Sequence, residues 1–267
     1  AEPNVLGAHS ATFTPPRSLR YRKKEGPFGQ PSVAGGAAEY APQEPGAQEG
    51  ADPAQFGADG AQGRGRPSGG FFYTGTNDGV TVNRSPVPED TQTWTHLALG
   101  SPYYARSLDR AASQLAVPDT AERPDSTVPQ GQSYEGVIFS SAALVADEDA
   151  PVASGQPKPD RDGVWFEGTA HLALALRERR AFGDETCARR LLASVERAQE
   201  LLGDGQTLGG TAVAEGCGVV SATSPLDTGF GFGYVPYRHT GATAWYLPAA
   251  ARANPLAVRD APDHRVV

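Results

Sequence analysis

The sequence predicts a mainly α-helical domain built from helical hairpins and preceded by a segment without a core. Residues 1–68 contain few large apolar side chains and are rich in Gly, Ala, Pro and Gln. They bury too little apolar surface to offset roughly 1–2 kcal/mol of backbone entropy per residue, so we expect disorder there. Pairs of helical patterns follow within residues 69–255, and residues 256–267 form a short tail.

The first ordered part is expected to be a small hairpin followed by two helices. Glycines bracket the aromatic stretch 71–73, and a turn signal follows it, with 80–82 as the second arm of the hairpin. Residues 88–99 have helical spacing and acids in the first turn, and Gly100 ends them. A second helix is predicted from Ser101 to about Val117.

The second predicted hairpin pairs an apolar helix with an amphipathic one. Residues 118–132 and 147–162 are polar and rich in proline, so they are predicted loops, whereas 137–145 fits a strand or a helix. A pattern that is apolar on nearly every side begins at Val164, as in a buried inner helix. Gly183 and Asp184 are predicted to end it and to cap the next helix, which runs to about Leu202.

The C-terminal part combines a glycine-rich region with one more helix. Residues 205–236 are expected to form a long structured loop or short strands. A last helix is predicted from Gly241 to about Ala253, with Pro248 bending it or limiting it to a turn or two. The three tryptophans Trp94, Trp165 and Trp245 each lie near the start of an apolar helix, as successive inner helices of a ring of hairpins would place them.

Composition excludes several classes of function. The net charge of −8 argues against non-specific nucleic-acid binding, which needs a basic face. No apolar run reaches the roughly 18–20 residues that span a bilayer. Cys187 and Cys217 fit either a disulfide or two thiols, and no zinc spacing surrounds them. The chain begins with Ala and contains no Met, so we expect a processed product or a fragment.

Several motifs within residues 69–255 resemble bacterial proteins of the six-hairpin glycosidase type. The resemblance implies an (α/α)₆ toroid whose inner helices line a cleft, with long rim loops. A full toroid has about twelve helices and five are predicted, so we expect a partial toroid, truncated or disrupted at its N-terminus. The motifs are Tyr73-Thr74-Gly75-Thr76, Asp78-Gly79-Val80-Thr81-Val82-Asn83, Glu89-Asp90-Thr91-Gln92-Thr93-Trp94, Val164-Trp165-Phe166-Glu167-Gly168-Thr169-Ala170, His239-Thr240-Gly241-Ala242-Thr243-Ala244-Trp245-Tyr246 and Asn254-Pro255.

Many proteins of this type are hypothetical or are exported by the twin-arginine route. The resemblance therefore implies an extracellular or periplasmic location if the parent protein is exported, and a cytoplasmic one otherwise. It leaves the substrate open.

Three carboxyl groups are candidates for acid–base chemistry. Glycoside hydrolysis generally uses two carboxyl groups that flank the scissile bond. Glu167 starts the most apolar helix, where partial desolvation raises a carboxyl pKa and favours a general acid. Asp90 is the candidate base, and Glu89 is a further candidate. For each, the alternative is an ordinary acid at a helix N-terminus that satisfies free backbone amides.

Aromatic and polar residues near these acids are candidates for gripping a sugar. Tryptophan on an apolar helix also fits plain core packing, and His171, one turn after Glu167, also fits a core histidine. The aromatic residues of the glycine-rich region are less committed to the core and suit a subsite wall. The predicted substrate-binding residues are Gln92, Trp94, Trp165, His171, Phe232, Tyr237, His239 and Trp245.

The sequence thus predicts a glycoside hydrolase-like enzyme that acts on a polysaccharide or oligosaccharide. We expect no metal and no organic cofactor, and the expected partner is a carbohydrate. Two alternatives stay open at this point: a non-catalytic carbohydrate-binding toroid, and an inactive, incomplete gene product that exposes apolar helix faces to water.

Overall fold

The structure is a computed structural model that describes residues 40–41, 70–78, 80–214 and 216–257. All described residues belong to one compact unit within Ala34–Val267. The disorder predicted for residues 1–68 therefore falls outside the described residues, apart from the strand β1 (Tyr40–Ala41). The predicted tail is described only as far as residue 257.

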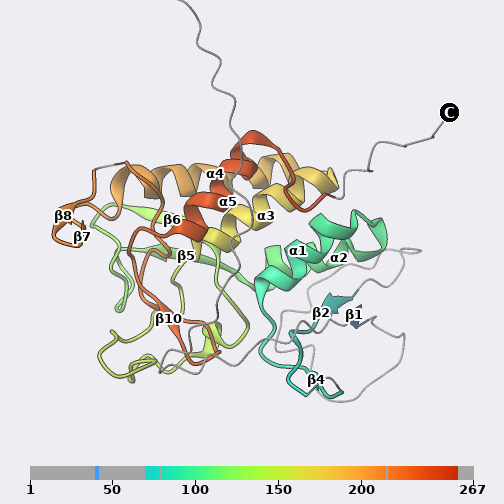
Figure 1. The fold of residues 1–267 in the computed structure, drawn as a ribbon, viewed down its shortest axis with the longest axis horizontal. Helices are drawn as coiled ribbons and strands as arrows, with labels where there is room; N and C mark the ends of the chain where they lie inside the picture. Colours follow the sequence, from blue (N-terminus) through green and yellow to red (C-terminus); the bar gives the residue numbers. More distant parts are fainter. Residues whose placement is uncertain (1–39, 42–69, 79, 215, 258–267) are drawn as a thin grey trace, which may run out of the picture. The chain divides into compact units, whose positions relative to one another are not determined.

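The described part is rich in helix and carries small antiparallel sheets, so the prediction of a mainly helical domain is confirmed at this level (Figure 1). The α-helices are α1 (Glu89–Leu99), α2 (Arg106–Gln114), α3 (Phe166–Arg179), α4 (Asp184–Leu201) and α5 (Thr240–Ala251), with 3₁₀ turns at Pro102–Tyr104 and Ala143–Val145. The strand pairs are β1 with β2 (Phe71–Phe72), β3 (Gly75–Thr76) with β4 (Val82–Asn83), β5 (Ala116–Thr120) with β6 (Ser133–Val137), β7 (Thr207–Leu208) with β8 (Thr211–Ala212), and β9 (Leu226–Asp227) with β10 (Gly233–Tyr234).

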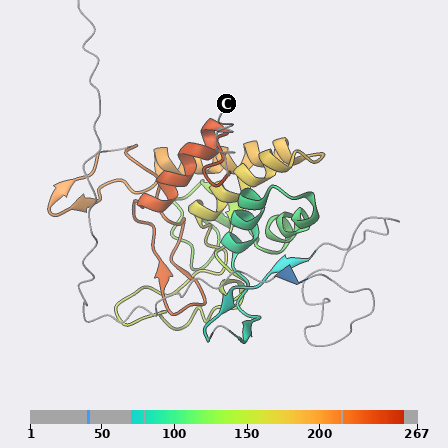
Figure 2. The same ribbon diagram turned by 45° about the vertical axis from the view of Figure 1, so that its right-hand side comes forward.

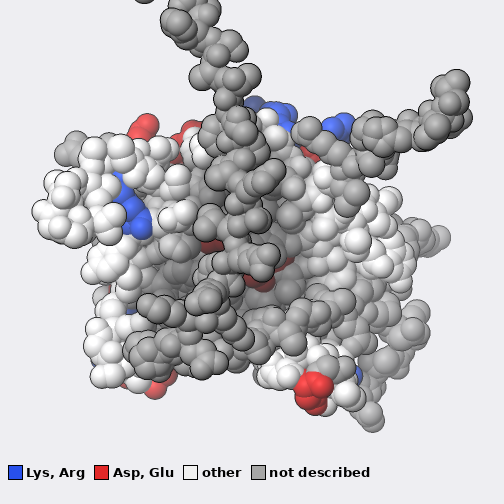
Figure 3. Space-filling model, viewed as in Figure 1, with Lys and Arg blue, Asp and Glu red and all other residues white. Residues whose placement is uncertain are grey.

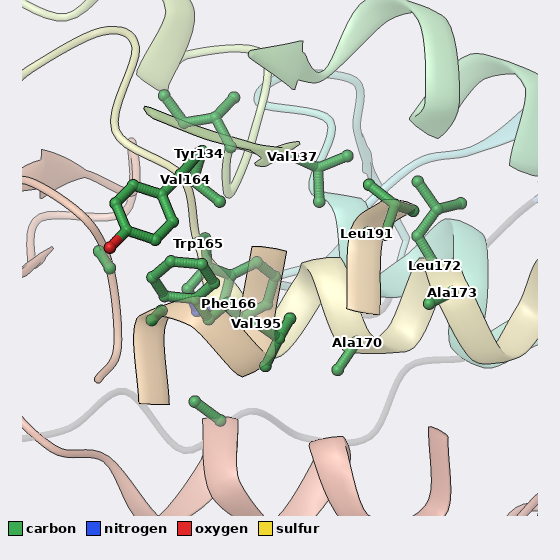
Figure 4. Close-up of a cluster of buried hydrophobic side chains, with 14 of the residues drawn as sticks. Tyr134, Val137, Val164, Trp165, Phe166, Ala170, Leu172, Ala173, Leu191 and Val195 are labelled. Carbon is green, nitrogen blue, oxygen red and sulfur yellow. The ribbon is translucent and has the colours of Figure 1, made fainter. Parts of the chain in front are cut away.

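Helix α3 is the centre of the packing. It contacts α1, α2, α4 and α5, and all its residues from 168 to 176 are buried. This agrees with its sequence, since a helix that is apolar on nearly every side has to be covered by neighbours. Helix α4 instead buries one face and exposes the other, as its amphipathic sequence predicts. Figure 4 shows part of the core, where Phe166 and Tyr134 lie edge to face with centroids 5.9 Å apart.

The helix ends agree with prediction at α1 and differ at α2. Gly100 ends α1 in a left-handed conformation, with φ of 60°. Helix α2, however, ends at Gln114, and the predicted extension to Val117 is wrong. Residues 116–120 alternate between exposed and buried side chains, which is the period of a strand, and they pair with β6.

The connection between α3 and α4 also differs from prediction. The left-handed residue that ends α3 is Arg180, and Gly183 is the N-cap of α4. Asp184 lies inside the first turn of α4. Its carboxylate accepts a bond of 2.7 Å from the Ala181 amide and two bonds from the Arg179 guanidinium. The ion pair between Arg179 and Asp184 joins the end of α3 to the start of α4, and Gly183 is the N-cap of α4.

The glycine-rich region contains short strands, as one of the two expectations for it states. The β7–β8 hairpin projects from the side of the domain (Figure 2). Helix α5 continues through Pro248 for its full twelve residues, so the prediction that Pro248 limits it to a turn or two is wrong. Helix α5 packs against α3. Both cysteines are free thiols.

Candidate active site

Backbone hydrogen bonds bring the beginnings of α1, α3 and α5 together. The Glu89 amide donates to the Phe139 carbonyl at 2.9 Å, and the Trp165 amide donates to the Val137 carbonyl at 2.8 Å. Val137 is the last residue of β6 and Phe139 follows it by two residues, so α1 and α3 start side by side. The His239 amide donates to Val219, and the Phe166 amide donates to Ser221, which places the start of α5 at the same location.

Three carboxyl groups meet there, and we call Glu89, Asp90 and Glu167 the carboxyl cluster. Burial raises the pKa of Glu167 to about 7, and the nearby Asp90 charge adds to this. Burial also raises the pKa of Asp90 to about 6. The pKa of Glu89 lies well above its ordinary value because the group is buried, with the charges of Asp90 and Glu167 adding to the effect. On the face drawn in Figure 3, red acidic atoms are visible inside a hollow.

Glu89 is turned into the protein and does not face solvent. Its side chain is fully buried, and its Oε2 lies 3.4 Å from Nδ1 of His171. His171 accepts a hydrogen bond of 3.2 Å at Nε2 from the Trp94 indole, so Nδ1 carries the ring proton and donates to Glu89. Burial lowers the pKa of His171 to about 3. Because the imidazole ring is neutral, this contact is a hydrogen bond rather than an ion pair.

Glu167 has the surroundings of a proton donor. Its side chain is 14% exposed, so it is the member of the predicted acid–base pair that is both desolvated and open to a ligand. Two ring nitrogens face it: Nε2 of His171 at 3.9 Å and Nδ1 of His239 at 3.6 Å. Each of these nitrogens already accepts a hydrogen bond, from Trp94 and from the Ala242 amide respectively. Because neither carries a proton toward Glu167, both favour its protonated form.

Aromatic rings surround the carboxyl cluster, and we call Trp94, Trp165, Trp245, Phe232 and Tyr234 the aromatic wall. The three tryptophans gather around His171, with ring centroids 5.3, 5.6 and 4.3 Å from it in sequence order. The Trp94 ring, which is 39% exposed, stacks on Trp245 at 5.8 Å. Tyr234 stacks on Trp165 at 6.0 Å and meets Phe232 at 5.9 Å.

The charges of the carboxyl cluster also affect the pKa of Tyr234. Burial raises its pKa to about 12, and the charges of Glu167 and Asp90 add to this. The aromatic wall includes Trp94 of α1, Trp245 of α5, Trp165 at the N-cap of α3 and Tyr234 of β10.

Two predicted binding residues lie outside this arrangement. Gln92 is fully buried, and its amide group bonds to the backbone of Phe72 and Pro88, which occupies it in joining α1 to β2. Tyr237 is 65% exposed and makes no ring contact with the aromatic wall. His239 is brought in, where it caps α5 and faces Glu167.

Two glycines that sequence reasoning missed hold the site open. A Cβ on Gly241 would collide with the Glu167 carboxyl group and lie 2.8 Å from Cε1 of His239. A Cβ on Gly168 would collide with the Trp165 ring and lie 3.0 Å from Oε2 of Glu89. Glycine in the first turn of a helix is unfavourable relative to alanine. In the sequence, Gly168 directly follows Glu167 and Gly241 lies two residues after His239. A glycine at such a position could have indicated a closely packed site.

We expect Gly241→Ala to destabilise the protein by about 1–3 kcal/mol, because the added methyl group overpacks the Glu167 carboxyl. In a Glu167→Ala background the carboxyl is gone, so the same substitution should cost clearly less. Urea unfolding of the four chains of this double-mutant cycle measures the coupling. Additive effects of the two substitutions would contradict the predicted contact.

Two cavities lie elsewhere in the described part of the chain. One of about 330 Å³ is flanked by the ion pairs Arg123–Asp162 and Arg161–Glu148, and the buried Asp160 also lines it. The other, of about 270 Å³, lies between β5, β6 and α4. Neither contains the aromatic wall, and we place the candidate site at the carboxyl cluster because acids with raised pKa values and exposed rings meet there.

No group of three or more His, Cys, Asp or Glu side chains within the described ranges has the arrangement of a metal site. None of the described helices combines the length and apolar character needed to cross a membrane. Comparison with protein-family models, curated proteins and solved structures found no match for this chain.

Proposed function

We propose that the chain is a glycoside hydrolase-like enzyme acting on a polysaccharide or oligosaccharide. The observation that carries the proposal is Glu167, a partly exposed acid with a pKa of about 7, set among tryptophan rings beside a second acid, Asp90. Hydrolysis of a glycosidic bond uses such a pair, one group protonated and one ionised.

In this proposal Glu167 protonates the departing glycosidic oxygen, and its facing histidine nitrogens keep it protonated until then. Asp90, with its lower pKa, is ionised and serves as the base. Glu89 is fully buried, so we assign it a positioning role: it holds His171, which in turn holds the Trp94 ring. The exposed faces of Trp94 and Phe232 pack against the C–H faces of sugar rings.

The partial toroid belongs to the same proposal. Helix α3 has the all-round burial of an inner helix and α4 the single apolar face of an outer one. Helices α1 and α5, which carry the other two tryptophans, would be the neighbouring inner helices.

The test is to incubate the full chain with a panel of polysaccharides and to measure new reducing ends. The double variant Asp90→Asn/Glu167→Gln, purified in parallel, is the control for contaminating glycosidases. We expect at least one glycan to be cleaved by the wild-type chain alone. Binding of glycans by both chains without cleavage by either would favour the alternative of a carbohydrate-binding module, which keeps the aromatic wall but needs no acid–base pair. The absence of both would refute the proposal.

A further inference from the structure

We propose that the glycan recognised by this site carries a positive charge, as a glucosamine unit with a free ammonium group does. The inference rests on the proposed function for the glycan itself. The charge follows from three features of the carboxyl cluster and the aromatic wall: unpaired acids, hydrogen-bond acceptors without donors, and ring faces beside them.

The first feature is that no cationic side chain from the described part of the chain belongs to the cluster. The buried Asp184 is neutralised by Arg179 at 2.7 Å, so this fold pairs a buried acid with an arginine elsewhere. Within the described residues, no lysine or arginine forms an ion pair with Glu89, Asp90 or Glu167. Arg238, next to His239, is held by Asp204 and by two backbone carbonyls. The positive charge that would balance the ionised Asp90 is thus left to a ligand.

The second feature is an excess of acceptors. Oδ1 of Asp90 and Oε1 of Glu89 are buried and have no hydrogen-bond partner among the residues that the structure describes. A buried acceptor without a donor is unfavourable, and an ammonium group supplies three donors at one point. A uronic acid would add acceptors and a like charge, which the site disfavours.

The third feature is the aromatic wall. The stacked pair Trp94–Trp245 lies beside His171, within the same group of side chains as the carboxyl cluster. A cation above a tryptophan face is attracted by the negative centre of the ring, most strongly where water is partly excluded. The wall accepts the apolar face of a sugar as well, so one surface binds both parts of an amino sugar.

The experiment is titration calorimetry of the full chain at about pH 6, where a sugar amine is protonated. The probes are three β-1,4-linked tetramers, of glucosamine, of N-acetylglucosamine and of glucose. We expect the glucosamine tetramer to bind roughly 10- to 100-fold more tightly than either neutral tetramer. Asp90→Asn should reduce this ratio strongly, because Asp90 is the more ionised of the two acids at this pH. Glu167→Gln should reduce the ratio less, and the double variant should abolish it.

The control variant is Glu178→Gln, which removes the same charge from an exposed position of the same helix. It should leave the ratio unchanged, and circular dichroism shows whether each variant is folded. Equal affinities for the three tetramers, a preference that survives in the folded double variant, or no binding of any tetramer would overturn the inference. Preferential binding without cleavage would sink only the proposed enzyme activity, whereas cleavage of a neutral glycan without a charge preference would sink only this inference.

Discussion

Replacing Glu167 with glutamine is expected to lower kcat on a cleaved glycan by about 10²- to 10⁴-fold, the usual contribution of a general acid. The glutamine keeps the size of the side chain but has no acidic proton to give to the departing oxygen. KM should change little, because the aromatic wall stays in place. Glu178→Gln on the exposed side of α3 is the matched control and should retain full activity. Initial rates of reducing-end formation measure both.

The pH profile separates this role from a purely structural one. Glu167 has to be protonated, so activity should fall as the pH rises through about 7. Asp90 has to be ionised, so activity should also fall as the pH drops through about 6. The expected profile is a narrow bell between these values, and the residual activity of Glu167→Gln should lose the alkaline limb. An alkaline limb that persists in the variant would exclude Glu167 as the acid.

Glu167→Gln should lower activity but raise the stability of the folded protein at alkaline pH. The folded-state pKa of Glu167 lies above its ordinary value, so its contribution to stability is present at low pH and is lost as the pH rises through about 7. At about pH 8 the wild-type protein holds an unfavourable charge that Glu167→Gln lacks. We therefore expect the variant to unfold at higher urea concentration than the wild type at this pH, with a smaller difference at about pH 5.

The second large effect is expected in the core. Phe166→Ala should reduce the free energy of unfolding by about 3–5 kcal/mol, because the Phe166 side chain is completely buried at the start of α3 and its removal leaves a cavity. Its ring packs edge to face against Tyr134, so this contact is lost as well. Thermal and urea unfolding, monitored by circular dichroism, give the change.

The chain offers a matched control for that measurement. Phe182, in the connection between α3 and α4, is fully exposed. Phe182→Ala removes the same group from water instead of from the core, and we expect a change within about 0.5 kcal/mol. If both variants lost similar stability, the packing around α3 would differ from that described here.

The sequence by itself determined the features that depend on local chemistry. Glycine 100 ends α1, the apolar run after Val164 is the buried central helix, and the tryptophans lie near the helix beginnings. Each follows from backbone preference or from periodicity, which neighbouring residues decide. The desolvation of Glu167 was also predictable, because an acid beside Phe166 on an apolar helix has few waters around it.

Only the tertiary structure decided what lies next to what. Residues 116–120 are a strand because β6 pairs with them, and α5, which packs against α3, continues through Pro248. Glu89 and Asp90 are sequence neighbours with the same alternatives, yet the Glu89 side chain contacts His171, whereas the Asp90 carboxyl accepts a hydrogen bond from the Thr91 backbone. Proton positions on His171 and His239 follow from partners 77 residues away and three residues away, respectively. The contact of His171 depends on long-range packing, which a single sequence does not record, and the role proposed for His171 depends on that packing.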